Sequence, residues 1–513
     1  MEELLLGIDV GTTMVKAALF TTTGVLEHVA ARPNPVYCPR PGWSECRMEV
    51  VWESAAGVVR DLLRSSGVST RRLVGLGLTG NMGGAWLVGE DDIPVRSAIL
   101  WNDGRAASLL RRWYEDGTLA RIFATSLTAP APGFTLPLLL WLRDYERHSL
   151  DRVQRLVFAK DWIRFHLTGQ WATDPSEITH VPGDVATGYR SMGLLGEFGM
   201  ERFAALFPPL REMVAVAGEV TGDAAHATGL PMGLPVVTGA GDVTATVVGM
   251  DATRPGRYSV IAGTSCLVNL SGARADSDGP VSGITFLTPV GLLRSQPNQT
   301  GTLALDWLAR VLWDEASGTV HTKLQEVAER APRGAGGLLF LPYLNSTGLV
   351  APVYEPFARG QLFGLGLEHC QPHIARAVFE GLALAVADGI AHLRGGENHI
   401  RLAGGLARNE FWCQLVADVT GMEVIVPAGE ELGALGACML AAVSIGLYPD
   451  VSSAQAVMAR IAHRYKPQSD RRDFYGAALE AYQAVRGALL PVFRYREQLA
   501  GDAAGDETVG SPQ

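Results

Sequence analysis

A carboxylate and a Gly-Thr-Thr turn stand between two apolar runs near the start of the chain. The runs cover residues 4–8 and 15–20 and are typical of buried strands. The polar and small residues between them are Asp9, Gly11, Thr12 and Thr13. Glycine beside hydroxyl residues brings backbone N–H and side-chain O–H donors together, and such donors can cradle an anion without positive charge. The stretch therefore predicts a strand hairpin whose turn faces phosphate.

The same pattern recurs at residues 257–270. An apolar run leads there into Gly263 and Thr264, and a second apolar run follows. Two such turns on separate domains could hold a polyphosphate from both sides, with Lys16 adding a point charge at the first turn. The alternative is a pair of ordinary hairpin turns. The recurrence, together with Asp9, favours phosphate binding.

Two other phosphate-binding motifs find no support. The sequence has no Gly-Lys dipeptide, so it contains no Walker A loop. A G-x-G-x-x-G pattern does occur at residues 75–80, but it lies within an apolar strand pattern and no helix pattern follows it. We interpret this second match as chance.

Three aspartates lie next to apolar strands or glycine turns and are candidates for functional roles. Asp9 follows a buried strand, where an unpaired charge is costly, and a Mg²⁺ ion held by carboxylate and phosphate oxygens would explain it. Asp242 follows a strand and a Gly-Ala-Gly turn, so it either caps a helix or accepts the proton of a substrate hydroxyl, as a kinase requires. The glycines favour the second role, because they let a substrate approach closely. Asp103, in "LWNDGR", is either a turn residue or a ligand for sugar hydroxyls.

The second half of the chain carries a double glycine at a strand end. Gly404 and Gly405 end a predicted strand, and a flat ring could lie against their backbone. Asn409 then either hydrogen-bonds such a ring or caps the following helix. The eleven histidines show no metal-ligand spacing, and we assign none of them to catalysis. No G-x-S-x-G motif supports a serine hydrolase.

Composition narrows the class of protein. The chain has 513 residues, 47% of them hydrophobic and 19% charged, and a net charge of −10. Without a basic stripe, nucleic acid is not expected as a partner. The first residues do not read as a signal peptide, the apolar runs are too short to span a bilayer, and the six cysteines are scattered. We therefore expect a cytoplasmic protein with no membrane partner.

The recurring hairpin indicates an ancient duplication of an α/β domain. We place the boundary near residue 249, so that residues 1–249 form the first domain, with the sugar and phosphate side. Residues 250–495 then form the second domain, with the nucleotide side. Residues 496–513 are polar and rich in glycine, and we expect them to be a disordered tail.

Together these motifs resemble the FGGY family of carbohydrate kinases, from Leu5 to about residue 495. The most specific stretch is "GQLFGLGLEHCQPHIARAVFE", which fits the C-terminal signature of the family throughout. Five shorter stretches are similar to xylulokinases in particular: "GIDVGTTMVKAALF", "PGWSE", "AILWNDGR", "GAGD" and "AGGLARNEFW". The resemblance implies two duplicated actin/hexokinase/Hsp70-like (ribonuclease H-like) α/β domains with a cleft between them. It also implies the transfer of the γ-phosphoryl group of ATP to a sugar hydroxyl, with Mg²⁺ as a second cofactor.

The resemblance also implies roles for individual residues. Asp242 would be the catalytic base, and Asp9 would be the carboxylate linked to Mg²⁺. The residues expected to bind ATP are Gly11, Thr12, Thr13, Lys16, Gly263, Thr264, Gly404, Gly405 and Asn409. The residues expected to bind the sugar are Met82, Gly83, Trp101, Asn102, Asp103 and Asp242.

The chain departs from the family pattern at two positions. Xylulokinases typically read Gly-Gln-Met-His-Gly where this sequence has "GNMGG", so Gly83 replaces a substrate-facing histidine. Leu138 stands where the family signature expects a lysine. The loss at position 83 predicts an empty space beside Met82 and weak discrimination among ketopentoses.

A ketopentose, with xylulose first, is the expected substrate. Another pentulose, erythritol and glycerol are the alternatives within the family. A homodimer is the assembly that we consider. The rival class is a non-kinase, actin-like switch that binds ATP between two domains, and the residues around Trp101 and the "GAGD" turn argue against it because such a switch has no need of a sugar site.

Overall fold

The computed structural model describes the chain except for residues 1, 182, 273–278, 315–319, 346 and 507–513, and it describes side chains as far as Arg496. The chain forms two compact units. The first comprises Met1–Arg257, Leu270–Arg294 and Pro427–Ala462. The second comprises Tyr258–Asn269, Ser295–Val426 and His463–Gln513. The sequence predicted one boundary near residue 249, and the units depart from it where residues 270–294 and 427–462 join the first unit.

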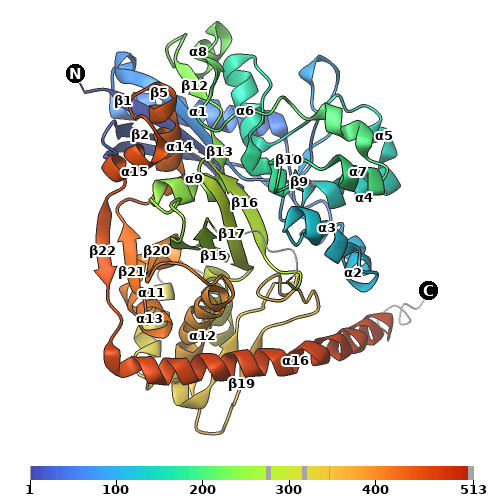
Figure 1. Ribbon diagram of the computed structural model, residues 1–513, viewed down its shortest axis with the longest axis vertical. Helices are drawn as coiled ribbons and strands as arrows, with labels where there is room; N and C mark the ends of the chain where they lie inside the picture. Colours follow the sequence, from blue (N-terminus) through green and yellow to red (C-terminus); the bar gives the residue numbers. More distant parts are fainter. Residues whose placement is uncertain (1, 182, 273–278, 315–319, 346, 507–513) are drawn as a thin grey trace. The chain divides into compact units, whose positions relative to one another are not determined.

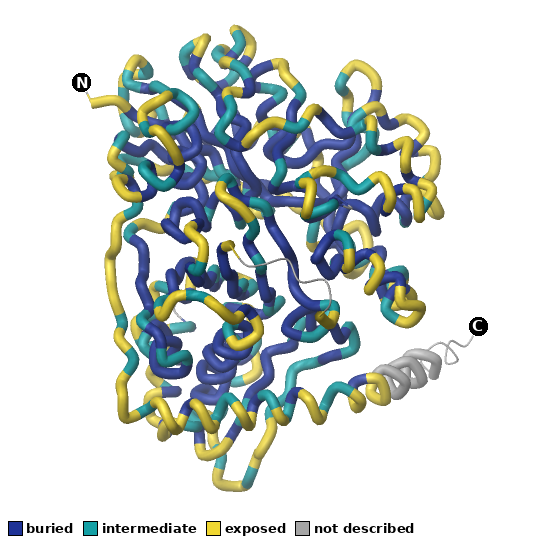
Figure 2. The backbone as a smooth tube through the Cα atoms, in the orientation of Figure 1, coloured by how far each residue is buried: buried dark blue, intermediate teal, exposed yellow. Residues whose placement is uncertain are grey.

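The first unit is built on a seven-stranded sheet (Figure 1). The strand order is β11-β12-β5-β1-β2-β3, and β13 pairs with β5. The bounds are β1 (Leu4–Val10), β2 (Met14–Thr21), β3 (Leu26–Pro33), β5 (Leu73–Gly80), β11 (Val216–Glu219), β12 (Pro235–Val237) and β13 (Ala240–Gly241). β1 is antiparallel to β2 and parallel to β5, and the side chains of Leu4, Leu6 and Ile8 are at most 1% exposed. Strands of this sheet are among the segments drawn as buried in Figure 2.

Helices that pack on this sheet supply the rest of the first core. They are α1 (Met48–Ser66), α6 (Ala159–Thr168), α8 (Gly222–Thr228), α9 (Asp242–Gly249), α14 (Leu432–Ser444) and α15 (Val451–Met458). The predicted strand, turn and helix around Asp242 are confirmed as β12, β13 and α9. The G-x-G-x-x-G pattern lies inside β5, as the sequence predicted.

Glycines explain why α14 belongs to the first unit. A Cβ atom added to Gly7 on β1 would lie 2.5 Å from the carbonyl oxygen of Ala434, and one added to Gly77 on β5 would lie 2.1 Å from that of Ala437. The helix backbone therefore rests directly on the sheet, at a distance that only glycine allows. The small residues of α14 predicted such close packing, but not the strands that receive it.

Further short elements complete the first unit between and beyond these. The helical ones are α2 (Ala107–Glu115), α3 (Thr118–Ser126), α4 (Thr135–Tyr145), α5 (Arg147–Leu150), α7 (Met192–Glu197), η1 (Thr70–Arg72), η2 (Glu90–Asp92), η3 (Pro175–Thr179) and η4 (Glu201–Leu206). The strands are β4 (Glu45–Cys46), β6 (Trp86–Val88), β7 (Ala98–Ile99), β8 (Arg155–Val157), β9 (Gly183–Asp184), β10 (Tyr189–Arg190) and β16 (Ile284–Thr288).

The second unit has a parallel core of its own. β14 (Tyr258–Ala262) pairs with β20 (His399–Ala403), and β20 pairs with β21 (Glu423–Pro427), all in parallel. Its helices are α10 (Thr302–Trp313), α11 (Val320–Ala328), α12 (Gln371–His392), α13 (Glu410–Thr420), α16 (Arg472–Asp506), η5 (Ala335–Gly337), η6 (Gly405–Arg408) and η7 (Ser469–Arg471). The remaining strands are β15 (Cys266–Ser271), β17 (Gly291–Asn298), β18 (Leu339–Leu341), β19 (Gln361–Phe363) and β22 (Ile461–Tyr465).

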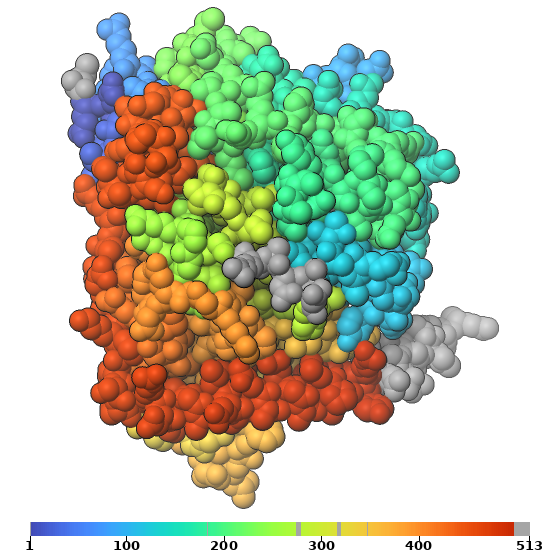
Figure 3. All heavy atoms as spheres, in the orientation of Figure 1, coloured from blue at the N-terminus to red at the C-terminus, as the bar shows by residue number. Residues whose placement is uncertain are grey.

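The C-terminal helix α16 overlaps the tail that the sequence expected to be disordered. The helix extends to Asp506, so residues 496–506 of that tail are helical, and residues 507–513 lie outside the described residues. Figure 3 shows much of α16, in red, at the surface of the molecule. Among the helices that the structure describes, none is both long enough and apolar enough to cross a bilayer.

Candidate functional site

The first Gly-Thr-Thr turn is a tight hairpin that neighbouring polar groups hold in place. It joins β1 to β2, with Val10 opposite Val15 and Asp9 opposite Lys16. The Asn34 side-chain amide donates to the Gly11 carbonyl (2.9 Å), and the Asn34 backbone N–H donates to the Thr13 carbonyl (2.8 Å). The backbone carbonyls of the turn are thereby used within the protein.

Trp101 meets this turn. Its indole N–H donates to the hydroxyl oxygen of Thr12 at 3.0 Å. Eighty-nine residues separate the two side chains along the chain. The structure thus brings together a residue expected to bind phosphate and one expected to bind sugar, both in the first unit.

Asp9 is a partly exposed residue whose carboxyl group is surrounded by protein. Burial raises its pKa to about 6; the nearby Lys16 ammonium lowers this value, and Glu431 raises it. The Oδ1 atom of Asp9 has no hydrogen-bond partner among the described residues. An unpartnered carboxylate oxygen at a hairpin turn is the chemistry that a hard cation such as Mg²⁺ satisfies.

Lys16 is not a free point charge beside the turn. Its ammonium group lies 2.9 Å from Oε1 and 3.0 Å from Oε2 of Glu431, at the start of α14. The sequence expected Lys16 to act on phosphate. The ion pair neutralises much of its charge, and residues 415 positions apart gave no sequence signal of it.

Asp242 is the first residue of α9, directly after β13. Its Oδ1 atom accepts a hydrogen bond from the N–H of Val243 at 2.8 Å, while Gly241 occupies the N-cap position. Burial, and then the negative charge of Asp9, raise the pKa of Asp242 to about 7, although the residue is partly exposed. The negative charge of Asp9 therefore makes it harder for Asp242 to ionise, and Asp242 can both lose and hold a proton near neutral pH.

Met82 and Gly83 lie beside Asp242. A Cβ atom added to Gly241 would fall 2.4 Å from Sδ of Met82, so the Met82 side chain rests on the residue before Asp242. Gly83 has a φ of +72°, and a Cβ atom there would fall 2.6 Å from Cδ2 of His180. The sequence predicted an empty space at this point. That prediction is wrong, because the His180 ring fills it.

A buried charged cluster supports the same two loops. The Lys160 ammonium lies 2.7 Å from Oε1 of Glu177 and 2.6 Å from Oδ2 of Asp174. Glu177 accepts the N–H of Gly83 (3.2 Å), and Ser176 accepts the N–H of Gly241 (2.8 Å). The segment around η3 therefore connects the loop of Gly83 to the loop of Asp242.

This buried cluster contains more carboxyl groups than cations. Asp161, Asp174 and Glu177 face two cations, Lys160 and Arg164. Burial raises the pKa of Glu177, and the Lys160 ammonium offsets only part of that rise. Burial lowers the pKa of Lys160, but the three nearby carboxylates raise this pKa by more than burial lowers it, so the ammonium stays charged.

The Asp103 carboxylate is hydrogen-bonded to neighbouring groups of the protein. One oxygen accepts from the backbone N–H and Nε of Arg105, both at 2.8 Å, and the other accepts from the N–H of Ser44 at 2.6 Å. The Arg105 guanidinium also lies over the ring of Trp43 at 4.0 Å. These contacts favour the turn role that the sequence left open for Asp103. The preceding Asn102 is exposed.

The second Gly-Thr turn meets two other glycine turns, all in the second unit. The N–H of Thr302, at the start of α10, donates to the Gly263 carbonyl (2.8 Å), and the N–H of Gly301 donates to that of Thr264 (2.7 Å). A Cβ atom on Gly404 would fall 2.5 Å from the Ala262 carbonyl. Thr264 is exposed, and a Cβ atom on Gly263 would meet no atom within 4 Å among the described residues. Three turns thus converge on an open edge at a helix N-terminus, which suits an anion.

Asn409 both caps a helix and binds a neighbouring side chain. Its Oδ1 accepts the N–H of Trp412 (2.8 Å), and its amide N–H₂ donates to Gln325 (3.0 Å). The structure confirms the helix cap, one of the two alternatives for Asn409, and hydrogen bonding to a ring stays a prediction.

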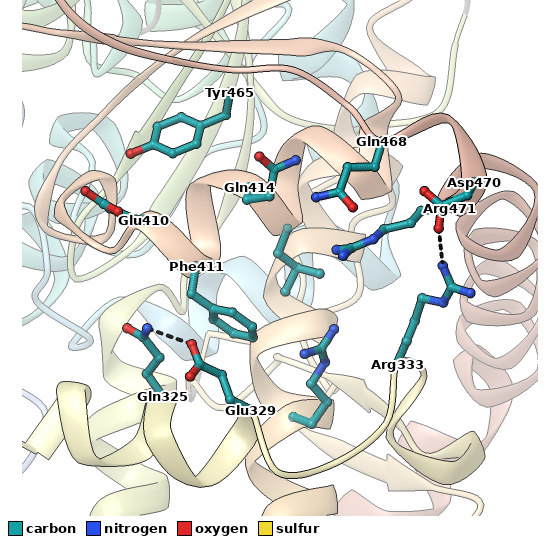
Figure 4. Close-up of a pocket in the computed structure, with 12 residues that line it drawn as sticks. Gln325, Glu329, Arg333, Glu410, Phe411, Gln414, Tyr465, Gln468, Asp470 and Arg471 are labelled. Carbon is teal, nitrogen blue, oxygen red and sulfur yellow. Dashed lines mark hydrogen bonds and ion pairs between the residues drawn. The ribbon is translucent and has the colours of Figure 1, made fainter.

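A pocket of about 840 Å³ begins beside Asn409 (Figure 4). Gln325, Glu410 and Phe411 line it on α11 and α13, and Tyr465 lines it from a later segment. Three arginines also line the pocket, and each has an acidic partner: Arg333 with Asp470 (3.7 Å), Arg376 with Glu380 (2.7 Å) and Arg471 with Asp418 (2.6 Å). A pocket with aromatic and amide walls and paired charges suits a neutral ring better than a phosphate chain.

Sequence reasoning missed several of these residues. The missed residues are Lys160, Ser176, Glu177, His180, Gly301, Gln325 and Glu431. A charged "AKDW" on a helix start was a signal for Lys160, since a lysine beside apolar residues needs buried partners. Nothing local in the sequence relates the others to the motifs that they contact.

Comparison with known proteins decides the family. A family model described as the FGGY family of carbohydrate kinases, N-terminal domain, matches residues 4–249, and the corresponding C-terminal domain model matches residues 258–445. The chain belongs to the FGGY family of carbohydrate kinases. It is therefore a sugar phosphotransferase.

Individual FGGY relatives match nearly end to end. The chain is 27% identical to an L-xylulose/3-keto-L-gulonate kinase of Escherichia coli, over 95% of this chain and 98% of the relative. It is 31% identical to a xylulose kinase of Klebsiella pneumoniae, over 95% and 99%. The crystal structure of a xylulose kinase from Rhodospirillum rubrum has a TM-score of 0.84 at 28% identity, covering 96% of this chain and 100% of that one. These likenesses confirm the predicted two-domain α/β fold class.

Among the residues that the structure describes, no group of three or more His, Cys, Asp or Glu side chains could hold a metal ion on its own.

Proposed function

We propose that this carbohydrate kinase transfers the γ-phosphoryl group of ATP to a hydroxyl group of a ketopentose, with xylulose as the first candidate. The observation that carries the proposal is the pair of carboxylates in the first unit. Asp242 begins α9 with its pKa raised to about 7, and Asp9 stands beside the Gly-Thr-Thr turn with its pKa raised to about 6. A buried carboxylate that titrates near neutral pH suits proton transfer from a sugar hydroxyl.

Asp242 acts as the general base. Its carboxylate takes the proton of the attacking hydroxyl, the hydroxyl oxygen bonds to the γ-phosphorus, and the bond from that phosphorus to the bridging oxygen of ADP breaks. The hydrogen bond from Val243 to Oδ1 fixes the carboxyl group and leaves Oδ2 for the proton. Met82, resting on Gly241, forms an apolar wall beside the base.

Asp9 fits the role of a magnesium carboxylate. Its Oδ1 atom is buried and has no partner among the described residues, and its position next to Gly11 and Thr12 lies close to where phosphate would bind. When bound, Mg²⁺ would neutralise charge on the ATP phosphates. Lys16 lies opposite Asp9 on β2 and forms an ion pair with Glu431 at the start of α14.

ATP binds through both turns in this proposal. Thr12 and Thr13 of the first unit, and Gly263 and Thr264 of the second, contribute donors to the phosphates, with Gly404 beside the latter. The N-terminus of α10 lies beside the second turn, where the N–H groups of Gly301 and Thr302 donate to its carbonyls. Gly405, Asn409 and the pocket beside Gln325 then receive the adenine ring.

The acceptor side is built from Trp101, Asn102 and Met82 in the first unit. Trp101 donates to Thr12 (3.0 Å), so the acceptor side is tied to the phosphate turn. The names of the relatives, L-xylulose/3-keto-L-gulonate kinase and xylulose kinase, support a ketose acceptor. At 27% and 31% identity, the ketose itself has to be measured.

The test is ADP release in a coupled assay with ATP, Mg²⁺ and one acceptor at a time. The panel is D-xylulose, L-xylulose, D-ribulose, L-ribulose, erythritol and glycerol. We expect the highest kcat/KM with a xylulose, and a requirement for Mg²⁺ that chelation removes. Higher kcat/KM with erythritol or glycerol than with every ketopentose would overturn the proposed acceptor.

A further inference from the structure

The His180 ring occupies the place that a side chain at position 83 would take. A Cβ atom on Gly83 would fall 2.6 Å from Cδ2 of His180 and 2.9 Å from its Cγ. Ninety-seven positions separate the two residues, yet the ring lies against the Gly83 backbone, next to Met82. Because Met82 rests on Gly241, directly before Asp242, the ring belongs to the wall of the acceptor site.

Three contacts fix the orientation of His180. Its ring packs against the ring of Phe134, with centroids 4.3 Å apart, and its carbonyl accepts the N–H of Thr135 (3.0 Å). The preceding Thr179 hydroxyl donates to the Thr285 carbonyl (2.6 Å). The backbone of this segment is thus held on both sides of His180, and the Phe134 ring restricts the rotation of the imidazole.

The His180 ring keeps an unused polar atom. The residue is 7% exposed, and its Nδ1 has no hydrogen-bond partner in the part of the chain that the structure describes. Burial, with a smaller contribution from the Lys160 ammonium, lowers its pKa to about 3, so the imidazole is neutral at physiological pH. A buried polar atom without a partner costs free energy, and a ligand that supplies the partner recovers it.

Neighbours of His180 tie it to both catalytic loops. Four residues earlier, Ser176 accepts the N–H of Gly241, and Glu177 accepts the N–H of Gly83. The segment that carries His180 therefore contacts both the loop of Gly83 and the loop of Gly241 and Asp242. A polar atom on this segment keeps a fixed position relative to Asp242.

We propose that His180 is a specificity-determining residue, whose neutral imidazole hydrogen-bonds a hydroxyl or carbonyl oxygen of the sugar acceptor. The inference rests on the proposed kinase function. It assigns to His180, which directly follows η3, the polar contact that Gly83 lacks. Sugar hydroxyls both donate and accept, so the protonated nitrogen of the neutral ring can serve as a donor to them and the unprotonated nitrogen as an acceptor.

Two substitutions separate the polar contact from the packing. His180→Phe keeps a planar ring against Phe134 and Gly83 but removes both nitrogens, whereas His180→Asn retains a donor and an acceptor near the position of Nδ1. His166→Phe is the matched control. This second half-buried histidine of the first unit packs against Trp52 (4.8 Å) and Trp162 (4.3 Å), and its Nε2 also has no partner among the described residues.

The measurements are kcat and KM for the best ketopentose and for ATP, and the ratio of kcat/KM between the best and the worst ketopentose. We expect His180→Phe to lower kcat/KM for the sugar about ten- to a hundredfold, the usual effect of leaving a ligand hydroxyl unpaired, and to flatten the ratio. The KM for ATP should stay within about twofold of the wild type. His180→Asn should recover part of the loss, and His166→Phe should match the wild type.

Two results would overturn the inference. One is a His180→Phe enzyme that matches His166→Phe in sugar kcat/KM and in selectivity. The other is a loss of sugar kcat/KM that is equally large in His180→Asn and in His180→Leu, which has a similar volume but no polar atom. The comparison of His180→Asn with His180→Leu also tests the inference if His180→Phe does not fold. A wild-type enzyme without ketopentose activity would instead overturn the proposed acceptor, so the two failures are distinguishable.

Discussion

The two Gly-Thr turns share a sequence pattern but differ in their surroundings. The first, at residues 11–13, has side-chain chemistry around it: Asp9 on one strand, the Lys16–Glu431 ion pair on the next and the Trp101 indole on the Thr12 hydroxyl. The second, at residues 263–265, has backbone around it, namely the start of α10 and the Gly404 turn.

This difference indicates a division of work. Two carboxylates with raised pKa values occur in the unit of the first turn, Asp9 beside the turn and Asp242 at the start of α9, and we propose them as the magnesium ligand and the base. Backbone N–H groups and glycines occur at the second, where a polyphosphate needs donors but no acid or base.

The largest expected effect comes from Asp242→Asn. The change is nearly isosteric but removes the base, and general-base contributions are commonly about 10²- to 10⁴-fold in turnover. ATP affinity by calorimetry should remain close to the wild type, since the second turn is untouched. Turnover above about half of the wild-type value would show that Asp242 is not the base.

Thr264→Val and Thr12→Val sharpen the comparison of the turns. Each removes a hydroxyl donor, and a lost hydrogen bond to a charged group costs about 1.5–3 kcal/mol, roughly ten- to a hundredfold in ATP affinity. Thr12→Val also removes the acceptor of the Trp101 N–H, so it should raise the sugar KM, whereas Thr264→Val should leave it unchanged. Calorimetry and steady-state kinetics on both variants give the comparison. Equal effects of Thr12→Val and Thr264→Val on the sugar KM would contradict the difference between the two turns.

Lys16→Met should have a smaller effect. Because Glu431 already pairs with Lys16, the charge offered to phosphate is largely neutralised, and the KM for ATP should change only a few-fold. The double variant Lys16→Met, Glu431→Gln serves as the control and should resemble the single one. A loss of ATP affinity beyond that of Thr264→Val would mean that Lys16 leaves Glu431 to bind phosphate.

A small stability effect should accompany the loss of the base. The pKa of Asp242 is about 7 in the folded state, above the ordinary value of 3.8 for an aspartate, so the folded state binds this proton more tightly than the unfolded state does. The ionised carboxylate therefore destabilises the fold progressively as pH rises from about 4 to 7. Asp242→Asn should raise Tm more at pH 8 than at pH 5 by calorimetry. A Tm gain that is independent of pH would contradict this reasoning.

Local patterns predicted the elements of this site well. An apolar run, a small polar turn and a second apolar run predicted β1, β2 and the turn between them, and the strand, Gly-Ala-Gly and helix pattern placed Asp242 at the start of α9. These features depend on neighbours within a few residues, which sequence periodicity reports.

Contacts between distant segments were beyond such patterns. Glu431 neutralises Lys16 across 415 positions, and His180 fills the space at Gly83, which the sequence predicted to be empty. That prediction failed because a missing side chain was treated as a missing contact. The space around a glycine is set by whichever segment packs there, and the sequence alone does not say which one.

The pH dependence of kcat/KM for the sugar tests the assignment of the first turn and its base most directly. Asp242 works when ionised, so kcat/KM in the wild type should fall as pH decreases through about 7, and the residual activity of Asp242→Asn should lack that transition. Thr264→Val, measured alongside at saturating ATP, should keep the wild-type profile. A transition near pH 7 that persists unchanged in Asp242→Asn would contradict the account, because another group would then carry the proton.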